Sequence, residues 1–332
     1  MRIAVLMGGP SRERQVSLHS GRAVCAALAA RGHTVIPFEV RDERIEGLLP
    51  LEPDVAFIAM HGRFGEDGGV QRRCEALGLV YTGSGPRASA RAFDKAAARK
   101  LFSLAGLPIP AARVLEPPLT IEAVWSAMRA LGGHVVVKPT REGSSIGVHV
   151  LDDPRKIEPA VDELARLGGA VLVERFVAGR ELTVGVLGDR TLPPVETIPG
   201  RAFYDFRAKY DPNSGTRYVV DPPLERRVAG AVRRTALAAH VALGCRSFSR
   251  VDLRLTPTGE PMLLEVNTIP GMTSTSLLPK AAHAAGIEFG ALCEWMVLDA
   301  LRLARERRRA RPTGSDRTRR GPRTAPRGER AS

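Results

Sequence analysis

The chain contains 332 residues, of which 44% are hydrophobic and 26% are charged, and its formal net charge is +13 at pH 7. This composition excludes collagen, a disulfide-stabilised miniprotein and a fully disordered chain, and the length is sufficient for two or three domains. No hydrophobic run approaches the roughly 18 residues of a transmembrane helix, so we expect no membrane span. The four cysteines (25, 74, 245 and 293) form no CxxC pair and are predicted to be reduced packing residues of a cytoplasmic protein.

The positive charge is concentrated at the C-terminus. Residues 305–332 contain eleven arginines against three acidic residues and supply +8 of the net charge. Because this segment has almost no large hydrophobic residue, it is predicted to be a disordered, solvated tail. Binding of the tail to RNA or to an anionic membrane surface is the alternative. The remaining charge is ordinary for an enzyme of small molecules, and we expect no specific nucleic-acid partner.

The N-terminal part alternates strands with helices. Strands are expected at residues 3–7, 34–38 and 54–59. Ser11 is expected to cap a helix that reaches about Arg31. Since strands joined by helices form parallel sheets, residues 1–92 are predicted to be a Rossmann-like α/β domain that closes at the turn-rich stretch 83–86.

Two further units are predicted over residues 93–180 and 181–304. The elements expected there are helices at 94–105, 154–167 and 223–242, strands at 134–138, 148–151, 170–176, 248–255 and 262–266, and a loop rich in proline and tyrosine at 199–223. The last two strands are expected to form a hairpin around residues 256–259. This half of the chain therefore has α+β character.

The strands of that hairpin carry the strongest polar pattern. Arg250 and Asp252 lie two residues apart, as do Glu265 and Asn267, so each pair projects from one face of its strand. Pairing of the strands would place two carboxylates, an amide and a guanidinium on one surface. Such hard oxygen ligands suit Mg²⁺ or Mn²⁺ bridging phosphates. The alternative is a solvent-facing salt bridge between Arg250 and Asp252, which leaves Glu265 and Asn267 unexplained.

A glycine- and serine-rich loop follows a lysine at the end of another strand. In Lys138–Gly147 the small residues allow backbone N–H groups to approach a phosphate, and the lysine supplies a positive charge. The lysine precedes the glycines, so this is not a Walker loop, and an ordinary β-turn is the alternative. Gly8-Gly9 lacks the G-x-G-x-x-G pattern of dinucleotide-binding proteins.

A histidine and two acidic residues follow the third strand. The segment His61–Gly68 would lie at the carboxyl end of a parallel sheet, where α/β proteins bind ligands. A hydrogen-bonded structural histidine is the alternative.

Sequence motifs occur in a fixed order over about residues 2–300, and they are Gly8–Ser17, His61–Gly68, Tyr81–Gly85, Phe93–Lys95, Lys138–Gly147, Glu174–Glu181, Phe203–Tyr210, Arg250–Asp252 and Glu265–Ser276. This set resembles the D-alanine–D-alanine ligases of the ATP-grasp superfamily. The resemblance implies an ATP-grasp fold in which ATP lies between two sheets. It also implies ligation of two D-alanines through an acyl phosphate for peptidoglycan synthesis, with ATP, two Mg²⁺ or Mn²⁺ ions and commonly a homodimer.

The resemblance further implies roles for single residues. The implied nucleotide-binding residues are Lys95, Lys138, Ser145, Glu174, Phe176, Val177, Glu181 and Lys209. The implied metal ligands are Asp252, Glu265 and Asn267. The implied D-alanine-binding residues are Glu13, His61, Ser144, Ser276 and Leu277. The implied catalytic residues are Glu13, Ser144, Tyr210, Arg250, Gly271 and Ser276, of which Arg250 and the Gly271 N–H stabilise the oxyanion.

The resemblance also assigns the 199–223 loop as a lid and Tyr210 as a determinant of the acceptor. Ligases that use D-lactate commonly have His at this position, and a tyrosine cannot become cationic and repel an ammonium. D-alanine is therefore favoured over D-lactate or D-serine as the acceptor. The chain departs from the family pattern at Gln15, Arg72, Phe206, Ser247 and Arg254. Arg254 replaces a usual apolar residue, and we expect it either to extend toward phosphate or to face solvent.

Overall fold

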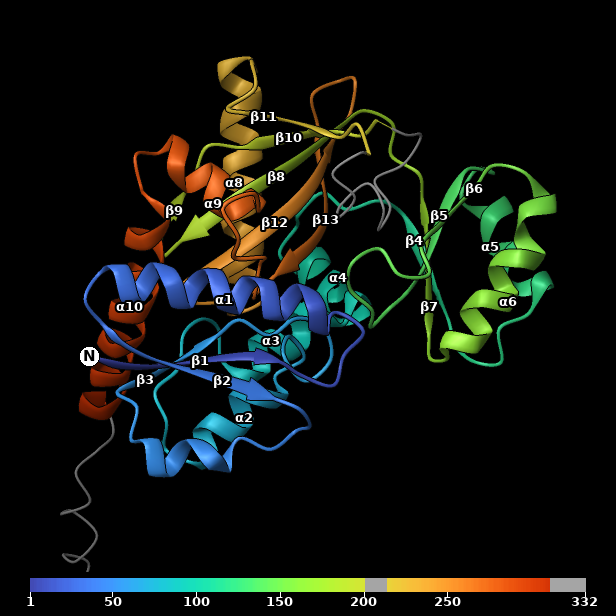
Figure 1. Cartoon of the computed structure of the whole chain (residues 1–332). Helices are drawn as coiled ribbons and strands as arrows, with labels where there is room; N and C mark the ends of the chain where they lie inside the picture. The colour runs from blue at the N-terminus through green and yellow to red at the C-terminus, as the bar shows by residue number, and fades with distance from the viewer. Residues whose placement is uncertain (201–213, 311–332) are drawn as a thin grey trace, which may run out of the picture.

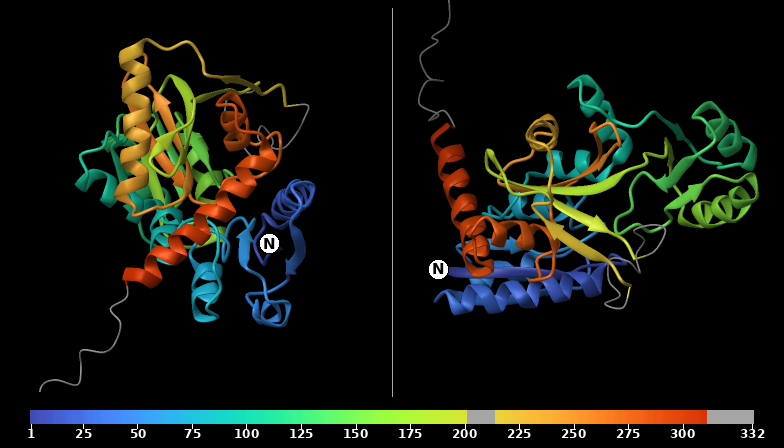
Figure 2. Two further views of the ribbon diagram at one scale, coloured as in Figure 1. Left: turned by 90° about the vertical axis from the view of Figure 1, so that its left-hand side faces the viewer. Right: turned by 90° about the horizontal axis from the view of Figure 1, so that it is seen from above.

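A computed structural model gives the fold of residues 1–200 and 214–310, and these residues form three β-sheets with helices packed against them (Figures 1 and 2). The expected combination of a parallel N-terminal sheet with an α+β half is confirmed. The domain limits at residues 92 and 180 remain predictions.

The N-terminal sheet is parallel and has the order β2-β1-β3. Its strands are β1 (Arg2–Gly8), β2 (Thr34–Val40) and β3 (Val55–Ile58). The helices and the one 3₁₀ helix of this part are α1 (Arg14–Ala30), η1 (Glu46–Leu51), α2 (Gly69–Ala76) and α3 (Pro86–Phe93). Residues 3–6 of β1 are fully buried, because a central parallel strand is covered on both faces.

Helix α1 begins later than the sequence suggests. Ser11 does not cap it, because its hydroxyl donates a hydrogen bond of 2.6 Å to the carbonyl oxygen of His61. Glu13 is the N-cap residue, yet its side chain makes no capping hydrogen bond. The Glu13 carboxylate is thereby available for another contact.

The middle sheet is antiparallel and has the order β4-β7-β5-β6. Its strands are β4 (Ala112–Leu115), β5 (Val135–Pro139), β6 (His149–Leu151) and β7 (Val171–Arg175). The helical segments of this part are α4 (Lys95–Leu104), α5 (Ile121–Ala130), η2 (Pro154–Lys156) and α6 (Ile157–Leu167). Helices α5 and α6 cover the outer face of the sheet, so its other face is directed toward the rest of the molecule (Figure 1).

The C-terminal sheet has the order β11-β10-β8-β12-β13, and β9 pairs with β8. Its strands are β8 (Arg180–Leu187), β9 (Arg190–Thr191), β10 (Val195–Ile198), β11 (Arg217–Val220), β12 (Phe248–Leu255) and β13 (Pro261–Asn267). The helices packed against it are α8 (Arg226–Ala242), α9 (Leu277–Ala284) and α10 (Phe289–Ala310). The β12–β13 hairpin therefore lies in this sheet, as predicted.

Two expected irregular segments contain regular structure. Strand β11 lies inside the expected loop 199–223, because Tyr218, Val219 and Val220 favour a strand and pair with β10. Helix α10 runs to Ala310. The prediction of a disordered tail from residue 305 is therefore wrong for residues 305–310. Arg302 forms an ion pair of 2.7 Å with Glu306 one turn along this helix, and arginines in its last turn interact favourably with the helix dipole.

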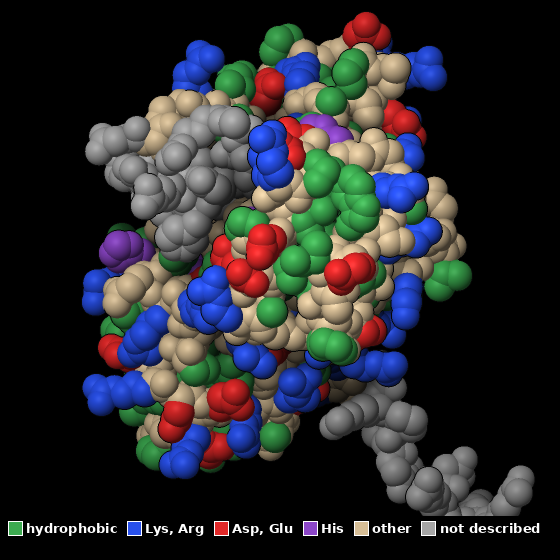
Figure 3. Space-filling model, turned by 90° about the vertical axis from the view of Figure 1, so that its right-hand side faces the viewer, with side chains coloured by type: hydrophobic (Ala, Val, Ile, Leu, Met, Phe, Trp, Pro, Cys, Tyr) green, Lys and Arg blue, Asp and Glu red, His purple; other side chains and the backbone are tan. Residues whose placement is uncertain are grey.

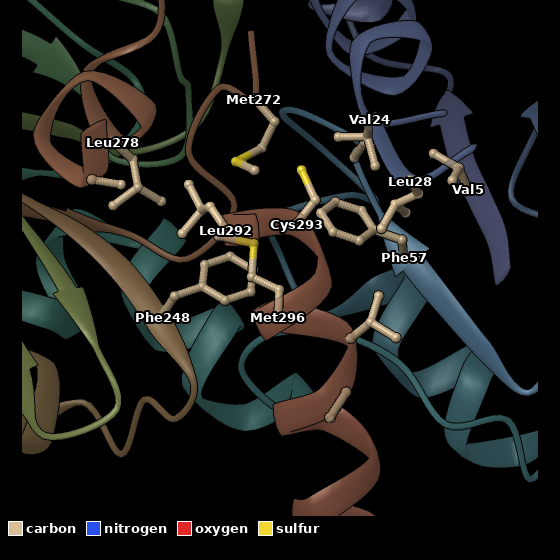
Figure 4. Close-up of a cluster of buried hydrophobic side chains, with 14 of the residues drawn as sticks. Val5, Val24, Leu28, Phe57, Phe248, Met272, Leu278, Leu292, Cys293 and Met296 are labelled. Atoms are coloured by element: carbon tan, nitrogen blue, oxygen red, sulfur yellow. The ribbon is translucent and has the colours of Figure 1, made fainter. Parts of the chain in front are cut away.

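A hydrophobic cluster joins the N-terminal and C-terminal sheets (Figure 4). Phe57 of β3 and Phe248 of β12 are at most 2% exposed, and Met296 of α10 lies in the same cluster. Burial of each such side chain contributes about 1.5–3 kcal/mol. The two sheets are therefore fixed against one another.

The backbone conformation at Ser247 explains why glycine is common at this position in the family that the chain resembles. Ser247 has a φ angle of 65°, is 4% exposed, and its hydroxyl has no hydrogen-bond partner among the described residues. Glycine adopts this left-handed conformation without strain. We expect Ser247→Gly to raise the free energy of unfolding by about 1 kcal/mol, measured by urea denaturation. The control, Ser249→Gly on the same segment, should lower the free energy of unfolding. A urea midpoint of Ser247→Gly below that of the wild type would contradict this interpretation.

Candidate active site

A cleft of about 830 Å³ lies between the three sheets. This volume is typical of small-molecule sites. The predicted site residues that line it are Glu13, His61, Lys95, Lys138, Ser144, Ser145, Glu174, Phe176, Val177, Glu181, Arg250, Asp252, Glu265, Asn267, Gly271, Ser276 and Leu277. Every predicted site residue that the structure describes thus lies on one cleft. Lys209 and Tyr210 lie outside the described residues, as does Phe206.

The Glu13 carboxylate is enclosed where the N-terminal domain meets the glycine- and serine-rich loop. Glu13 is 7% exposed, and the Ser144 hydroxyl donates a hydrogen bond to its Oε1. A Cβ atom added at Gly62 or at Gly143 would lie 2.6 Å from Glu13 Oε2. Glycine at both positions therefore allows the backbone to approach the acid. A buried carboxylate of this kind is suited to binding an ammonium group.

His61 connects the N-terminal domain to the loop that follows β13. Its Nε2 lies 3.0 Å from Ser20 Oγ, and its Nδ1 lies 3.4 Å from Glu66 Oε1. Ser20 Oγ also accepts the N–H of Met272 at 3.3 Å. His61 is therefore a hydrogen-bonded structural residue that lies on the cleft wall, and both interpretations of the sequence apply to it.

Lys95 lies at the start of α4, at the phosphate end expected for the nucleotide. Asp94 caps this helix by accepting the N–H groups of Ala96 and Ala97 at 3.0 and 3.1 Å. Lys95 Nζ donates to the Glu142 carbonyl oxygen at 2.7 Å and lies 3.6 Å from Glu265 Oε2. The cap fixes the start of α4, and Lys95 at that start places its ammonium group beside Glu265, an expected metal ligand.

Lys138 belongs to a buried group of charges. It forms an ion pair with Glu174, and Arg99 Nη1 lies 3.3 Å from the same carboxylate. Lys138 is 7% exposed and Glu174 is 3% exposed. Burial lowers the pKa of Arg99, and the nearby Glu174 opposes part of that shift. Two cations and one carboxylate leave a net positive charge beside the cleft.

The loop after Lys138 has an unusual backbone. Ser144 and Ser145 have φ angles of 48° and 58°, which are rare for residues other than glycine. Residues in such conformations cluster at ligand-binding segments. Both serines line the cleft, which agrees with the predicted approach of this loop to a phosphate.

The polar pattern on the hairpin forms the surface that the sequence predicts. Asp252 of β12 lies directly opposite Glu265 of β13, and Arg250 lies opposite Asn267. Arg250 Nε and Nη2 donate to the two oxygens of Asp252 at 3.0 and 2.8 Å. Thr183 Oγ1 donates to Asp252 Oδ1 at 2.8 Å. The expected salt bridge and the expected oxygen cluster therefore occur together.

These groups fit a hard divalent cation. A carboxylate has about four lone-pair sites, and the described residues use three of those on Asp252. Glu265 adds a second carboxylate, and Asn267 adds an amide oxygen that accepts the Ile269 N–H at 2.8 Å. In residues 1–200 and 214–310 no three His, Cys, Asp or Glu side chains gather as a metal cluster. A site here would thus rest on two carboxylates and an amide, a donor set typical for Mg²⁺ or Mn²⁺.

The opposite face of β12 carries a buried hydrogen bond to a histidine. Ser249 Oγ lies 2.7 Å from Nδ1 of His240, a buried residue of α8. Burial lowers the pKa of His240 to about 4, so this histidine is neutral at pH 7. The strand that carries Asp252 is therefore supported by a neutral hydrogen bond.

The N-terminus of α9 forms the far end of the cleft. Ser276 precedes the helix, and its Oγ accepts the Thr273 N–H at 3.2 Å. A Cβ atom at Gly271 would lie 2.9 Å from Ser276 Oγ, so the two residues are close neighbours. The positive end of the helix dipole favours an anion such as a carboxylate there.

Several residues of the cleft wall were not predicted, and they include Thr183, Glu142, Tyr218 and Thr273. Thr183 follows Glu181 by two residues on the same strand face, a spacing that could have identified it. Of the two expectations for Arg254, exposure to solvent is wrong, because its side chain is only 17% exposed, and extension toward phosphate remains a prediction. Its guanidinium contacts Glu181 and the Val177 carbonyl oxygen, and it does not face solvent.

The chain is similar to known proteins in both sequence and structure. The family model of the D-Ala–D-Ala ligase C-terminus matches residues 101–298. A D-alanine–D-alanine ligase of Desulforudis audaxviator is 46% identical over 310 residues, which is 92% of this chain and 99% of that protein. The Bacillus anthracis D-alanine–D-alanine ligase solved with ATP has a TM-score of 0.80 and 31% identity, and the match covers 92% of this chain and 99% of that one.

A ligase with a different acceptor shares the same fold. The VanG D-Ala:D-Ser ligase of Enterococcus faecalis has a TM-score of 0.75 and 26% identity, over 90% of this chain and 99% of that one. The similarity to D-alanine–D-alanine ligases extends over nine-tenths of the chain and includes all three sheets. The chain belongs to the D-alanine–D-alanine ligase family.

Proposed function

We propose that this cleft uses ATP to join two D-alanine molecules into D-alanyl-D-alanine, with release of ADP and phosphate. The observation that carries the proposal is the convergence of an enclosed carboxylate, two lysines and an oxygen-rich hairpin on one cleft, in a chain of this family. Each group has the chemistry that one part of the reaction requires.

The first step activates a carboxylate, which is a poor electrophile. A carboxylate oxygen of the first D-alanine attacks the γ-phosphorus of ATP, and the products are an acyl phosphate and ADP. Glu13, with His61 and Ser144, binds the ammonium of this D-alanine. Lys95, Lys138 and the N–H groups of the loop at Ser145 neutralise the transferring phosphoryl group, where positioning and electrostatics provide most of the catalysis.

Asp252, Glu265 and Asn267 would hold two Mg²⁺ or Mn²⁺ ions. Such ions supply further neutralisation of charge on the phosphates. At the other end of the nucleotide, Glu174, Phe176, Val177 and Glu181 hold the adenosine. In this proposal Lys209 also binds the phosphates of ATP, as Lys95 and Lys138 do.

The second step forms the peptide bond. The free amine of the second D-alanine attacks the acyl carbon, and phosphate leaves with the original carboxylate oxygen and takes up the proton that the amine loses. Arg250 and the Gly271 N–H stabilise the oxyanion, while Ser276, Leu277 and the α9 N-terminus bind the second carboxylate. Tyr210, on the proposed lid, orients the second substrate and excludes water, which would hydrolyse the acyl phosphate.

D-alanine is the proposed acceptor, in preference to D-serine or D-lactate. It is supported by the similarity of the chain to a ligase named for two D-alanines, with 46% identity over 92% of the chain. The proposal includes a cytoplasmic homodimer that supplies peptidoglycan precursor, as the resemblance implies. No described helix has the length and hydrophobicity needed to cross a bilayer.

A nucleic-acid or membrane-surface function finds no support on the face shown in Figure 3, where acidic and basic side chains are intermingled. Small molecules are therefore the proposed ligands. The basic residues 311–332 lie outside the described part of the chain.

Phosphate release with ATP and Mg²⁺, with products identified by mass, tests the substrate assignment. D-alanine alone should give ADP, phosphate and the dipeptide, whereas L-alanine should give none. With D-alanine plus D-lactate or D-serine, the dialanine should remain the main product. Turnover that requires D-lactate or D-serine would overturn the acceptor and leave ATP-dependent ligation in place.

A further inference from the structure

Arg254 contacts three of the four residues proposed to hold the adenosine. Its Nε donates to the Val177 carbonyl oxygen at 3.1 Å, and its Nη1 donates to Glu181 Oε2 at 3.1 Å. Its guanidinium carbon lies 5.5 Å from the centre of the Phe176 ring. One side chain thus joins the segment that follows β7 to the start of strand β8.

The orientation of this guanidinium is determined from several sides. Arg254 of β12 lies directly opposite Glu181 of β8, so the two side chains share a face of the sheet. The Phe176 ring is itself stacked on His134, with centroids 4.1 Å apart and an interplanar angle of 9°. An arginine that is stacked on an aromatic ring and hydrogen-bonded through two nitrogens loses little further freedom when a ligand binds.

The pair is also largely shielded from water. The side chains of Arg254 and Glu181 are 17% and 19% exposed, and both residues line the cleft. An ion pair in such surroundings is weakly screened and fixes its partners more strongly than a surface pair does. A fixed carboxylate presents its acceptor lone pairs in constant directions, which favours ligands whose hydroxyl groups match them.

We propose that Arg254 is a positioning residue of the nucleoside end of the cleft: it fixes the Glu181 carboxylate against the ribose and makes the enzyme select ribonucleoside triphosphates over 2′-deoxyribonucleoside triphosphates. This inference rests on the proposed placement of adenosine at Phe176, Val177 and Glu181. Arg254 does not touch the reacting phosphate, so its contribution is to nucleotide affinity and selectivity.

The test compares Arg254→Met and Arg254→Lys with a matched control, Arg180→Met. Arg180 lies on β8 of the same sheet and pairs with Glu196 at 2.7 Å, but it does not line the cleft. Equilibrium binding of ATP and of 2′-deoxy-ATP is measured by calorimetry with Mg²⁺ and without D-alanine. We expect Arg254→Met to weaken ATP binding about tenfold and to reduce the preference for ATP over 2′-deoxy-ATP at least threefold.

Arg254→Lys should retain part of the preference, because an ammonium can still reach Glu181, and Arg180→Met should bind as wild type does. In steady-state ligation, Arg254→Met should raise KM for ATP and leave kcat and the KM for D-alanine within about threefold of wild type. The proposal would be overturned if Arg254→Met kept the wild-type preference for ATP over 2′-deoxy-ATP, or if Arg180→Met lost this preference to the same extent. A fall in kcat of Arg254→Met with no change in KM for ATP would also overturn it. Wild-type ATP binding without dipeptide formation would instead overturn the proposed function, since the binding measurement does not depend on ligation.

Discussion

Glu265→Gln should reduce kcat for D-alanine ligation by about 10³ or more. The substitution keeps the size and shape of the side chain and removes one of the two carboxylates by which the hairpin lines the cleft. Glu265 lies opposite Asp252 and 3.6 Å from Lys95 Nζ, so its charge is placed between the other proposed metal-binding carboxylate and the lysine proposed to bind phosphate. Loss of a metal-binding charge raises the barrier to phosphoryl transfer by several kcal/mol.

The control for this variant lies on the same hairpin. Glu260 is exposed at the β12–β13 turn, and Glu260→Gln should leave turnover unchanged. Initial rates of phosphate release are measured over a range of Mg²⁺ concentrations, and the thermal midpoint is measured beside them. A Glu265→Gln enzyme with at least one-tenth of wild-type kcat at saturating Mg²⁺ would remove Glu265 from the metal site.

Lys138→Met should lower kcat/KM for ATP by about 10²–10³, because a positive charge in a partly dry cleft stabilises the transferring phosphoryl group far more than it would in water. The methionine side chain fills a similar volume. It leaves Glu174 with Arg99 as its described partner, and the destabilisation of the fold is expected to be about 1–3 kcal/mol.

Lys156→Met is the matched control for Lys138→Met. Lys156 lies at the start of α6 in the same part of the molecule, where it is exposed and pairs with Asp152. Urea denaturation separates loss of fold from loss of function. If Lys138→Met is folded and turns over with the wild-type kcat/KM for ATP, Lys138 makes no functional contact with phosphate.

Local patterns in the sequence predict the parts of the site that depend on strand periodicity. Arg250, Asp252, Glu265 and Asn267 share a surface because side chains two apart on a strand face the same way, and a short turn sets the pairing of the hairpin. The parallel N-terminal sheet follows equally from the alternation of strands and helices.

Contacts between distant segments could not be predicted in this way. Thr183 donates to Asp252 only because β8 pairs with β12 in one register, and no local signal specifies that register. The conformation of Arg254 depends on the same pairing and on the position of Phe176. The helices α3 and α5 were not predicted, although Pro86 and Thr120 are ordinary signals for the start of a helix.

Oxygen transfer from substrate to phosphate tests the central proposal most directly. D-alanine labelled with ¹⁸O in its carboxylate is incubated with the enzyme, ATP and Mg²⁺, and the released phosphate is analysed by mass. The acyl-phosphate mechanism predicts one ¹⁸O atom in each phosphate and formation of D-alanyl-D-alanine in equal amount. Phosphate without ¹⁸O, or ATP cleavage that does not depend on D-alanine, would contradict the ligase mechanism proposed for this cleft.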